Sequence, residues 1–562
     1  MSLTIKYLDT PEGAQTSATV TGVGLQPFSA ATSMATGADD VAWATTEPGM
    51  WLLDGSRDIL PDDPQNVGWW SAYPSMEARE GFILGKGILG VTPLGTGSRD
   101  GERTFETPPM LIIDFSSRFS ATGLTIKFSP STNQWCSHIR IKWYRGEELL
   151  AEGDERLGSP EWDGGGFVDS FDRITIEILE TSEPGHLAKI QQIVVGKLIV
   201  FGREEIASAQ LVNEVDHTLG TLPVDVSRYE VYAPEDLLLN PQQNQRVELY
   251  RDNQLLASHY IESGARTAAG CYVLNCQSAI GRLESDFMGN VYEEVPASDL
   301  IGDILLDGDF KFYIHPDLAR ATVTGYIAPC TRREALQQIC FAIGAMASTS
   351  KSDVINFMPI PEAGDGKFGN DDVFPGTEIE TTQRVAYVEV TSHRFKKSSE
   401  IETLLEDEEI DGEDVLFIFD APHWGYDISG GSITGDGANW ITVTASGLVT
   451  VTAKTYAHTT TVRRKKNPDA TYAERGNVVS ITEATLVNSA NVREVLDRVF
   501  DASVRCHTLT QDAIISDQTI GDYVTSVSTW GGTVTGIITS MDSTLTKGGH
   551  IARVVISGKE AT

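Results

Sequence analysis

The side chains that could perform acid–base, nucleophilic or metal chemistry are spread along this sequence without the spacings that such chemistry needs. The ten histidines include no pair four residues apart, and no His-Glu-x-x-His motif that could hold zinc is present. The sequence also lacks Gly-x-Ser-x-Gly, which presents a nucleophilic serine, and Gly-x-x-x-x-Gly-Lys-Ser/Thr, which binds phosphates. We therefore predict that the chain is not an enzyme. No catalytic, cofactor-binding or metal-ligating residue is assigned, and the residues that could bind another ligand stay unknown.

The six cysteines do not indicate a metal site or a disulfide framework. They are Cys136, Cys271, Cys276, Cys330, Cys340 and Cys506, and none belongs to a Cys-x-x-Cys pair. Cys271 and Cys276 are five residues apart on a predicted strand, so their side chains should point to opposite faces. Zinc is therefore not expected, and six cysteines in 562 residues are too few for a secreted disulfide scaffold. We expect buried, reduced thiols.

Two acidic segments could gather around a cation. Residues 400–414 carry nine acids in fifteen positions, but they lack the alternating Asp-x-Asp-x-Asp-Gly pattern of a calcium loop. A solvated linker is the preferred interpretation, and His393 and His423, which flank it, are read as surface residues without a role. The group Asp365, Asn370, Asp371 and Asp372 lies in a Gly-rich stretch, for which a flexible loop is favoured over a cation site.

Composition and charge exclude several classes of protein. With 41% hydrophobic and 22% charged residues the chain is globular, and its length predicts several domains. The net charge of −36, from 79 acidic and 43 basic residues, is opposite to that of a free nucleic-acid binder. The first ten residues do not resemble a signal peptide, and the most apolar stretch, 336–347, is too short to cross a bilayer. We therefore expect assembly in a cytoplasm and no membrane insertion.

Hydrophobic alternation and frequent turn residues predict a mainly β, multidomain protein with a few short helices. Ile139, Ile141 and Trp143 alternate with polar neighbours, which indicates a strand with one buried face. The predicted segments are an N-terminal arm or docking region (1–104), a jelly-roll-type β-sandwich (105–203), a barrel with helices (204–395), an acidic linker followed by a small β insert (396–474), and a second barrel (475–562).

The clearest predicted helix spans 331–345, where Thr331 and Glu334 form a capping box ahead of an amphipathic run. A second helix is expected from a cap at Ser298 to Leu305. A third covers 489–500, capped by Asn488 or Ser489.

In the small β insert, alternating runs surround Ser446-Gly447. This pattern predicts a hairpin with its turn at these two residues.

Two distant segments follow the same plan. Residues 246–275 and 522–557 each read as strand, tight turn, long strand, Gly-bearing loop and strand. Any antiparallel meander has this appearance, so the similarity alone is weak. Each segment is also accompanied by a core-facing helix, at 331–345 and at 489–500. We therefore prefer two copies of one barrel-like module, with other domains inserted between them.

The chain resembles the tail-hub proteins of bacteriophage baseplates, which close the tail tube. The resemblance is carried by Gln245–Leu256, Thr331–Gly344, Gly521–Val524 and Gly536–Ser540, and it covers about 205–395 and 475–562. It is a pattern of elements more than a diagnostic motif. Residues 105–203 look like a discoidin-type, galactose-binding-like sandwich. The long N-terminal half and the 415–465 insert depart from the simplest hub, which leaves the neighbouring proteins undetermined.

The resemblance implies a structural virion protein of the viral tail, assembled in the host cytoplasm as a homotrimer. Its implied partners are a tail tube or distal tail protein, the tape measure protein and a central spike or tip protein, with DNA present only in passage during genome ejection. Two alternatives stay open: a tail-associated carbohydrate-binding adhesin, whose sandwich would bind a host glycan, and a tail-associated cell-wall hydrolase or endopeptidase.

Overall fold

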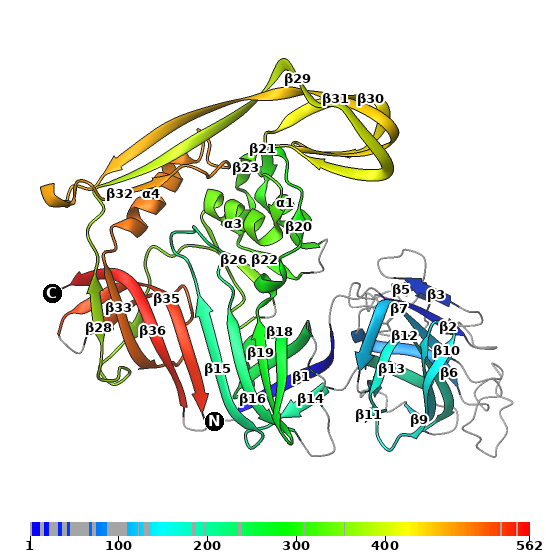
Figure 1. The fold of residues 1–562 in the computed structure, drawn as a ribbon. Coiled ribbons are helices and arrows are strands. Elements are labelled where there is room, and N and C mark those ends of the chain that lie inside the picture. The colour runs from blue at the N-terminus through cyan, green and yellow to red at the C-terminus, as the bar shows by residue number, and fades with distance from the viewer. Residues whose placement is uncertain are drawn as a thin grey trace.

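The computed structural model describes residues 110–562, except 122, 129–134, 183–186, 196–197, 234–238, 240, 242, 307–309, 353, 529–530, 547–548 and 562. It also describes the strands β1 (Leu3–Pro11), β2 (Thr16–Thr21), β3 (Thr32–Ala35), β4 (Ala42–Ala44), β5 (Val67–Trp69) and β6 (Ser75–Lys86). Most of the region predicted as an N-terminal arm lies outside the described residues. The chain is mainly β and multidomain, as predicted (Figure 1).

A thirteen-stranded sheet forms the body of the molecule (Figure 1). Its order is β14-β1-β17-β18-β19-β16-β15-β35-β36-β33-β28, and β34 pairs with both β35 and β27. The remaining bounds are β14 (Leu198–Phe201), β15 (Ile206–Glu214), β16 (Val226–Tyr232), β17 (Gln245–Arg251), β18 (Gln254–Ala268), β19 (Cys271–Gln277), β27 (Gly366–Phe368), β28 (Glu378–Thr381), β33 (His507–Ile514), β34 (Tyr523–Val527), β35 (Thr533–Thr546) and β36 (Gly549–Ala561).

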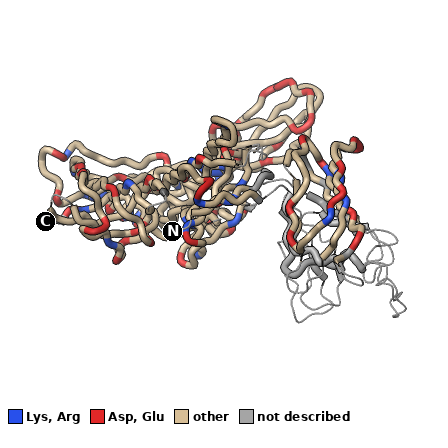
Figure 2. Tube along the Cα trace, turned by 90° about the horizontal axis from the view of Figure 1, so that it is seen from below, with Lys and Arg blue, Asp and Glu red and all other residues tan. Residues whose placement is uncertain are grey.

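Two antiparallel sheets before residue 196 form a separate body (Figure 1). Their orders are β10-β9-β12-β7-β2-β3 and β11-β8-β13-β6. The strands are β7 (Met110–Ala121), β8 (Leu124–Phe128), β9 (Cys136–Arg145), β10 (Glu148–Arg156), β11 (Glu161–Gly164), β12 (Val168–Thr181) and β13 (Leu187–Val195). Trp143 and Phe115 pack edge-on against Phe171, at ring distances of 4.7 and 5.3 Å. This body and the C-terminus lie at opposite ends of the molecule (Figure 2).

Two segments belong to a different sheet from the one that the sequence predicts. β1, predicted as part of an arm, is a strand of the large sheet between β14 and β17, and its Ile5 and Tyr7 are fully buried. The end of the predicted sandwich (105–203) is divided: β13 belongs to the smaller body, whereas β14 belongs to the large sheet. Both differences arise because these strands pair with segments that are distant in sequence.

Four α-helices are described, and the three predicted ones are among them. They are α1 (Ala297–Leu306), α2 (Pro316–Ala319), α3 (Arg332–Ile343) and α4 (Val492–Ser503). The capping box of α3 is confirmed, because the Glu334 N–H donates to Thr331 Oγ1 and the Thr331 N–H donates to the Glu334 carboxylate. The cap of α4 is Asn491 instead of Asn488 or Ser489, and the Asn488 amide donates to the Thr324 carbonyl.

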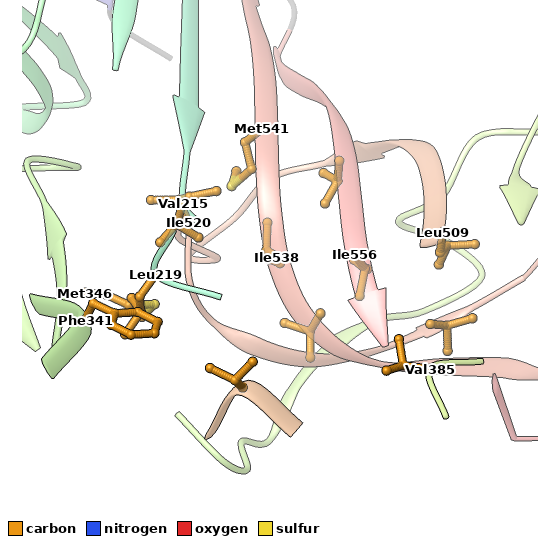
Figure 3. Packing of buried hydrophobic residues seen from close by; sticks show 14 of the residues in the cluster. Val215, Leu219, Phe341, Met346, Val385, Leu509, Ile520, Ile538, Met541 and Ile556 are labelled. Atoms are coloured by element: carbon orange, nitrogen blue, oxygen red, sulfur yellow. The ribbon is translucent and has the colours of Figure 1, made fainter. Parts of the chain in front are cut away.

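Short strands complete the helical layer around α1 and α3. They are β20 (Asp286–Phe287), β21 (Val291–Pro296), β22 (Phe312–Ile314), β23 (Thr322–Tyr326), β24 (Cys330–Thr331), β25 (Ala345–Ser348) and β26 (Ile355–Pro359). Their core contains the fully buried Leu336 and Ile339 of α3. A second core joins α4 to the C-terminal strands and includes Val495 of α4. Ile538 and Ile556 belong to the same core (Figure 3).

A three-stranded projection, here called the arm, extends above the helices (Figure 1). It consists of β29 (Tyr387–Ile418), β30 (His423–Asp436) and β31 (Trp440–Lys466), and β32 (Val478–Ile481) pairs with its base. The prediction of a solvated linker over 400–414 was wrong, because β31 supplies this segment with backbone partners. The predicted hairpin turn was also wrong: Ser446 and Gly447 lie inside β31, opposite Asp411 and Ile410.

Candidate assembly interface

Among the described residues no group of three or more histidine, cysteine, aspartate or glutamate side chains could hold a metal ion. Asp372 of the predicted loop accepts a hydrogen bond from the Gly369 N–H at 2.9 Å, which closes a local turn. All six cysteines are free, and four of them are buried; Cys271 and Cys330 are partly exposed. None of the described helices is long and apolar enough to span a membrane.

The two histidines predicted to lie on the surface are buried. His423 is 4% exposed, and its Nε2 lies 3.1 Å from Glu402 Oε2. His393 Nε2 lies 2.9 Å from the Thr482 carbonyl and therefore carries the proton, so its Nδ1 accepts from His458 Nε2 at 3.0 Å. Burial lowers the pKa of His393. The His393–Thr482 contact joins the arm to the segment after β32, whereas the other two contacts lie between strands of the arm.

The most informative arrangement is a five-strand pattern that occurs twice in the large sheet. In the first module the chain order β15, β16, β17, β18, β19 gives the sheet order β17-β18-β19-β16-β15. In the second module the chain order β28, β33, β34, β35, β36 gives the sheet order β34-β35-β36-β33-β28. All four pairings within each module are antiparallel. The two modules therefore have the same topology, which extends the predicted repeat from three strands to five.

The two modules are joined by one edge. β15, the outer strand of the first module, pairs with the second half of β35, from Ala209 opposite Leu545 to Glu214 opposite Ser540. The Gln210 amide adds a 2.9 Å hydrogen bond to Asp542 across this junction. Leu545 packs in the core of the first module, and Val215, which follows β15, packs in the core of the second (Figure 3). The junction is thus a hydrogen-bonded and packed interface between repeats.

The equivalent junction, at β28 and at the second half of β18, has no strand partner among the residues that the structure describes. β28, the counterpart of β15, is an edge strand that pairs with β33 alone. β18, the counterpart of β35, pairs with β17 only as far as Tyr260. Beyond Ile261 its residues Glu262–Ala268 are all exposed, whereas Met541, Ser543 and Leu545 at corresponding positions of β35 are at most 4% exposed. Each chain therefore offers β28 as one half of this junction and the second half of β18 as the other half.

A buried carboxyl group is hydrogen bonded just before the start of β16. Asp225 is 3% exposed, accepts the Glu214 N–H at 3.2 Å and accepts the Thr349 hydroxyl at 3.0 Å. Burial raises the pKa of Asp225 to about 6, although both hydrogen bonds oppose the rise. Asp216 lies in the loop just after β15. Burial raises the pKa of Asp216, but the hydrogen bonds that it accepts from Thr218 and Thr221 lower this pKa by more. The pKa of Asp216 is therefore below its usual value.

Two hollows lie beside the helices. One, of about 570 Å³, is next to the open end of β18 and is lined by polar residues that include Glu262, Arg282 and Arg332. The other, of about 320 Å³, lies between α3 and residues 480–486. Neither contains a pair of groups arranged for catalysis. Sequence reasoning missed the open edges, because the signal lies in the pairing order of strands and not in residue type.

No family model and no curated protein matches the chain. Its structure is similar to those of phage tail proteins. A 43 kDa tail protein of prophage MuSo2 from Shewanella oneidensis is 9% identical, with 64% of this chain and 95% of that chain covered and a TM-score of 0.39. A tail protein from Neisseria meningitidis MC58 is 12% identical, with 65% and 94% covered and a TM-score of 0.39. A chain of a native gene transfer agent virion is 11% identical, with 82% and 81% covered and a TM-score of 0.27.

Proposed function

We propose that this chain is a structural hub of a phage-type tail, in which three copies close a ring of six similar modules around a channel. The observation that carries the proposal is the repeated module with one occupied junction and two complementary open edges. Two modules joined edge to edge cover part of a closed wall. A second copy can continue the wall by the same contact that the chain already makes within itself.

The open edges have to be covered because exposed strand edges promote uncontrolled pairing. Cyclic closure covers the two open halves of the junction, at β28 and β18, with one repeated contact. In this ring β28 of one copy lies beside the Glu262–Ala268 segment of β18 in the next copy. With three copies, the junctions within and between chains alternate. The wall then presents six similar surfaces to a tube and three equivalent chains to a tip.

The repeat also predicts the pairing register between copies. Superposing the strand pairs of the two modules, with the matching bulges of β18 and β35 aligned, places Glu380 at the position of Val212 and Ala265 at the position of Asp542. Glu380 should then lie opposite Ala265 of the neighbouring copy, as Val212 lies opposite Asp542 within the chain. Directly opposed residues of antiparallel strands have Cα atoms about 4.5–5.5 Å apart, which suits a disulfide.

Disulfide trapping tests this ring. A chain carrying Ala265→Cys and Glu380→Cys, with Cys271→Ser and Cys330→Ser to remove the partly exposed thiols, should give a covalent trimer under mild oxidation. The matched control carries Gln210→Cys and Thr544→Cys, which face each other within one chain, and should form only an intramolecular bond. A control that oxidises while the test chain stays monomeric at high protein concentration would refute the ring.

The proposal assigns the remaining parts of the chain to the outside of the wall. The segments 105–203 and 415–465 should face outward because a closed sheet leaves no room for them, and the discoidin-like nature of the first is part of the proposal. The lumen should not be basic, since lysines and arginines would bind passing DNA. The proposed partners are the tube, tape measure and tip proteins, and the role is not enzymatic. A reconstruction of the assembled tail with six copies in this ring would contradict the stoichiometry.

A further inference from the structure

The arm has an unequal distribution of charge along its length. Residues 398–453, here called the tip, contain twelve acids and neither lysine nor arginine. The acids are Glu400, Glu402, Glu406, Asp407, Glu408, Glu409, Asp411, Glu413, Asp414, Asp420, Asp427 and Asp436, and all are exposed. Residues 387–397 and 454–466, here called the shaft, contain eight basic residues and the single acid Glu389. Acidic positions recur along the tip (Figure 2).

The tip has an outer sheet face that no described element covers. Its inner face forms a small core of Ile410, Ile441, Val443, Val449 and Val451, each at most 4% exposed. On the outside, the apolar side chains of Ile401, Leu416, Ile418 and Leu448 are 65, 47, 56 and 60% exposed. Leu416 and Ile418 are two residues apart on β29 and therefore share one face of the sheet, and neighbouring exposed apolar side chains among charges are typical of a protein contact surface.

The shaft offers the opposite charge without a partner of its own. Arg394, Lys396, Arg463 and Lys466 are exposed and form no salt bridge with any residue that the structure describes. Nearby, Arg464 pairs with Glu389, and Lys465 pairs with Asp497 of α4 at 2.6 Å. Among the acids of the tip, only Glu402 has a described ionic partner, the imidazole of His423. The two surfaces are therefore complementary and unpaired within one chain.

The position of the arm decides which molecule can bring these surfaces together. The shaft begins at Tyr387, soon after the edge strand β28 ends at Thr381. The arm then crosses the helical layer, where Phe395 contacts Tyr326 of β23 at a ring distance of 5.5 Å. Its tip ends on the opposite side from β28, beyond β21 and β23 (Figure 1). In the proposed ring that side is occupied by the neighbouring copy, whose own shaft starts beside its β28.

We infer that the tip of each arm docks on the shaft of the arm in the next copy, so that the arms form a closed girdle above the ring. This inference rests on the proposed ring and adds a second contact between the same copies. The acids of the tip would pair with Arg394 and Lys396 of the neighbouring shaft. Leu416 and Ile418 would be covered there. Because exposed charges are screened by salt, the contact should weaken as ionic strength rises.

Charge exchange tests the girdle in the Ala265→Cys/Glu380→Cys chain. Reversing the tip (Glu406→Lys, Glu408→Lys and Asp411→Lys) or the shaft (Arg394→Glu and Lys396→Glu) should slow covalent trimer formation at low salt by at least about tenfold. Combining both reversals should restore most of the rate. The matched control is Glu147→Lys with Glu148→Lys, two exposed acids of the sandwich, which should have no effect.

Zero-length coupling of carboxylates to amines supplies the second measurement. In trapped trimers, carbodiimide should link Lys396 to an acid of the tip of another copy, and peptide mapping should identify the link. Trapped trimers that form at an unchanged rate after reversal, and that contain no such link, would overturn the girdle and leave the ring standing. If no trimer can be trapped while the Gln210/Thr544 control oxidises, the ring itself fails, and the girdle fails with it.

Discussion

Asp225 offers a sharp test of how the first module is held together. Its carboxylate is buried where β15, β16 and the strand β25 meet, and it is hydrogen bonded to Glu214 and Thr349. Asn at this position keeps the shape and can keep both hydrogen bonds: its oxygen accepts from the Glu214 N–H, and its amide donates to the Thr349 hydroxyl. Asp225→Asn therefore removes the buried charge and little else.

The size of the effect follows from the pKa. A rise from 3.8 to about 6 makes ionisation cost about 3 kcal/mol more in the folded chain than in the unfolded chain. Because the folded pKa is the higher one, folding takes up protons between these values. The wild-type chain accordingly loses stability as pH rises from about 4 through about 6. Much of the loss occurs at low pH, so about 1 kcal/mol of it remains between about pH 5.2 and about pH 8.

The assay is urea unfolding of both proteins at these two pH values, which avoid precipitation near the isoelectric point of about 4.6. Stability of Asp225→Asn relative to wild type should increase by about 1 kcal/mol from the lower to the higher pH. Groups such as His550, whose pKa burial lowers to about 4, titrate in both proteins and cancel in the difference. A difference that stays constant, or that falls with pH, would refute the reasoning. Asp216→Asn is the matched contrast: because the pKa of Asp216 is lowered, this carboxylate is ionised in the folded and the unfolded chain at both pH values, and the stability difference from wild type should stay constant.

Three further substitutions test the helix α3 and the sandwich. Ile339→Ala should cost about 2–5 kcal/mol in thermal or urea unfolding, because Ile339 is fully buried in the core around α3; an unchanged transition would mean that α3 is not a structural brace. Thr331→Ala should cost about 0.5–2 kcal/mol by removing the cap of α3, and Thr331→Ser should restore most of it. Trp143→Ala should destabilise the sandwich by about 3–5 kcal/mol, because it packs against Phe171. Trp143→Ala should also leave disulfide trapping of the ring unchanged, and loss of trapping would show that the sandwich belongs to the wall.

The features that could be predicted from the sequence are those set by neighbouring residues. The capping box at Thr331 and Glu334 and the apolar spacing behind it act over four turns or fewer, and the helix is confirmed. Ser446-Gly447 has the composition of a turn, yet Gly447 adopts φ +144° inside a continuous strand. Whether such a pair turns or bulges depends on Ile410 and Asp411 opposite it, which are distant in sequence. Residues 400–414 were misread for the same reason: their acids are indeed solvated, but on a strand whose partner is not local.

The candidate interface was only half visible for a similar reason. The third to fifth strands of each module are joined by short turns, so their order can be read along the sequence as a repeat. The first two strands cannot, because residues 215–225 connect them in the first module and residues 382–506 connect them in the second. Their equivalence appears only in the pairing of β15 with β16 and of β28 with β33.

The two modules of the proposed ring differ in the length of the connection between their first two strands. A ring of six identical modules would carry either six arms or none, and its two faces would share one symmetry. Here the long connection, which includes the whole arm, belongs only to the second module. Modules with and without an arm must then alternate around the ring. The sheet can present six similar module surfaces on the wall, while the arms define three equivalent positions above it. Duplication of the five-strand module followed by insertion into one copy is thus sufficient to connect a sixfold partner with a threefold one, without a second protein between them.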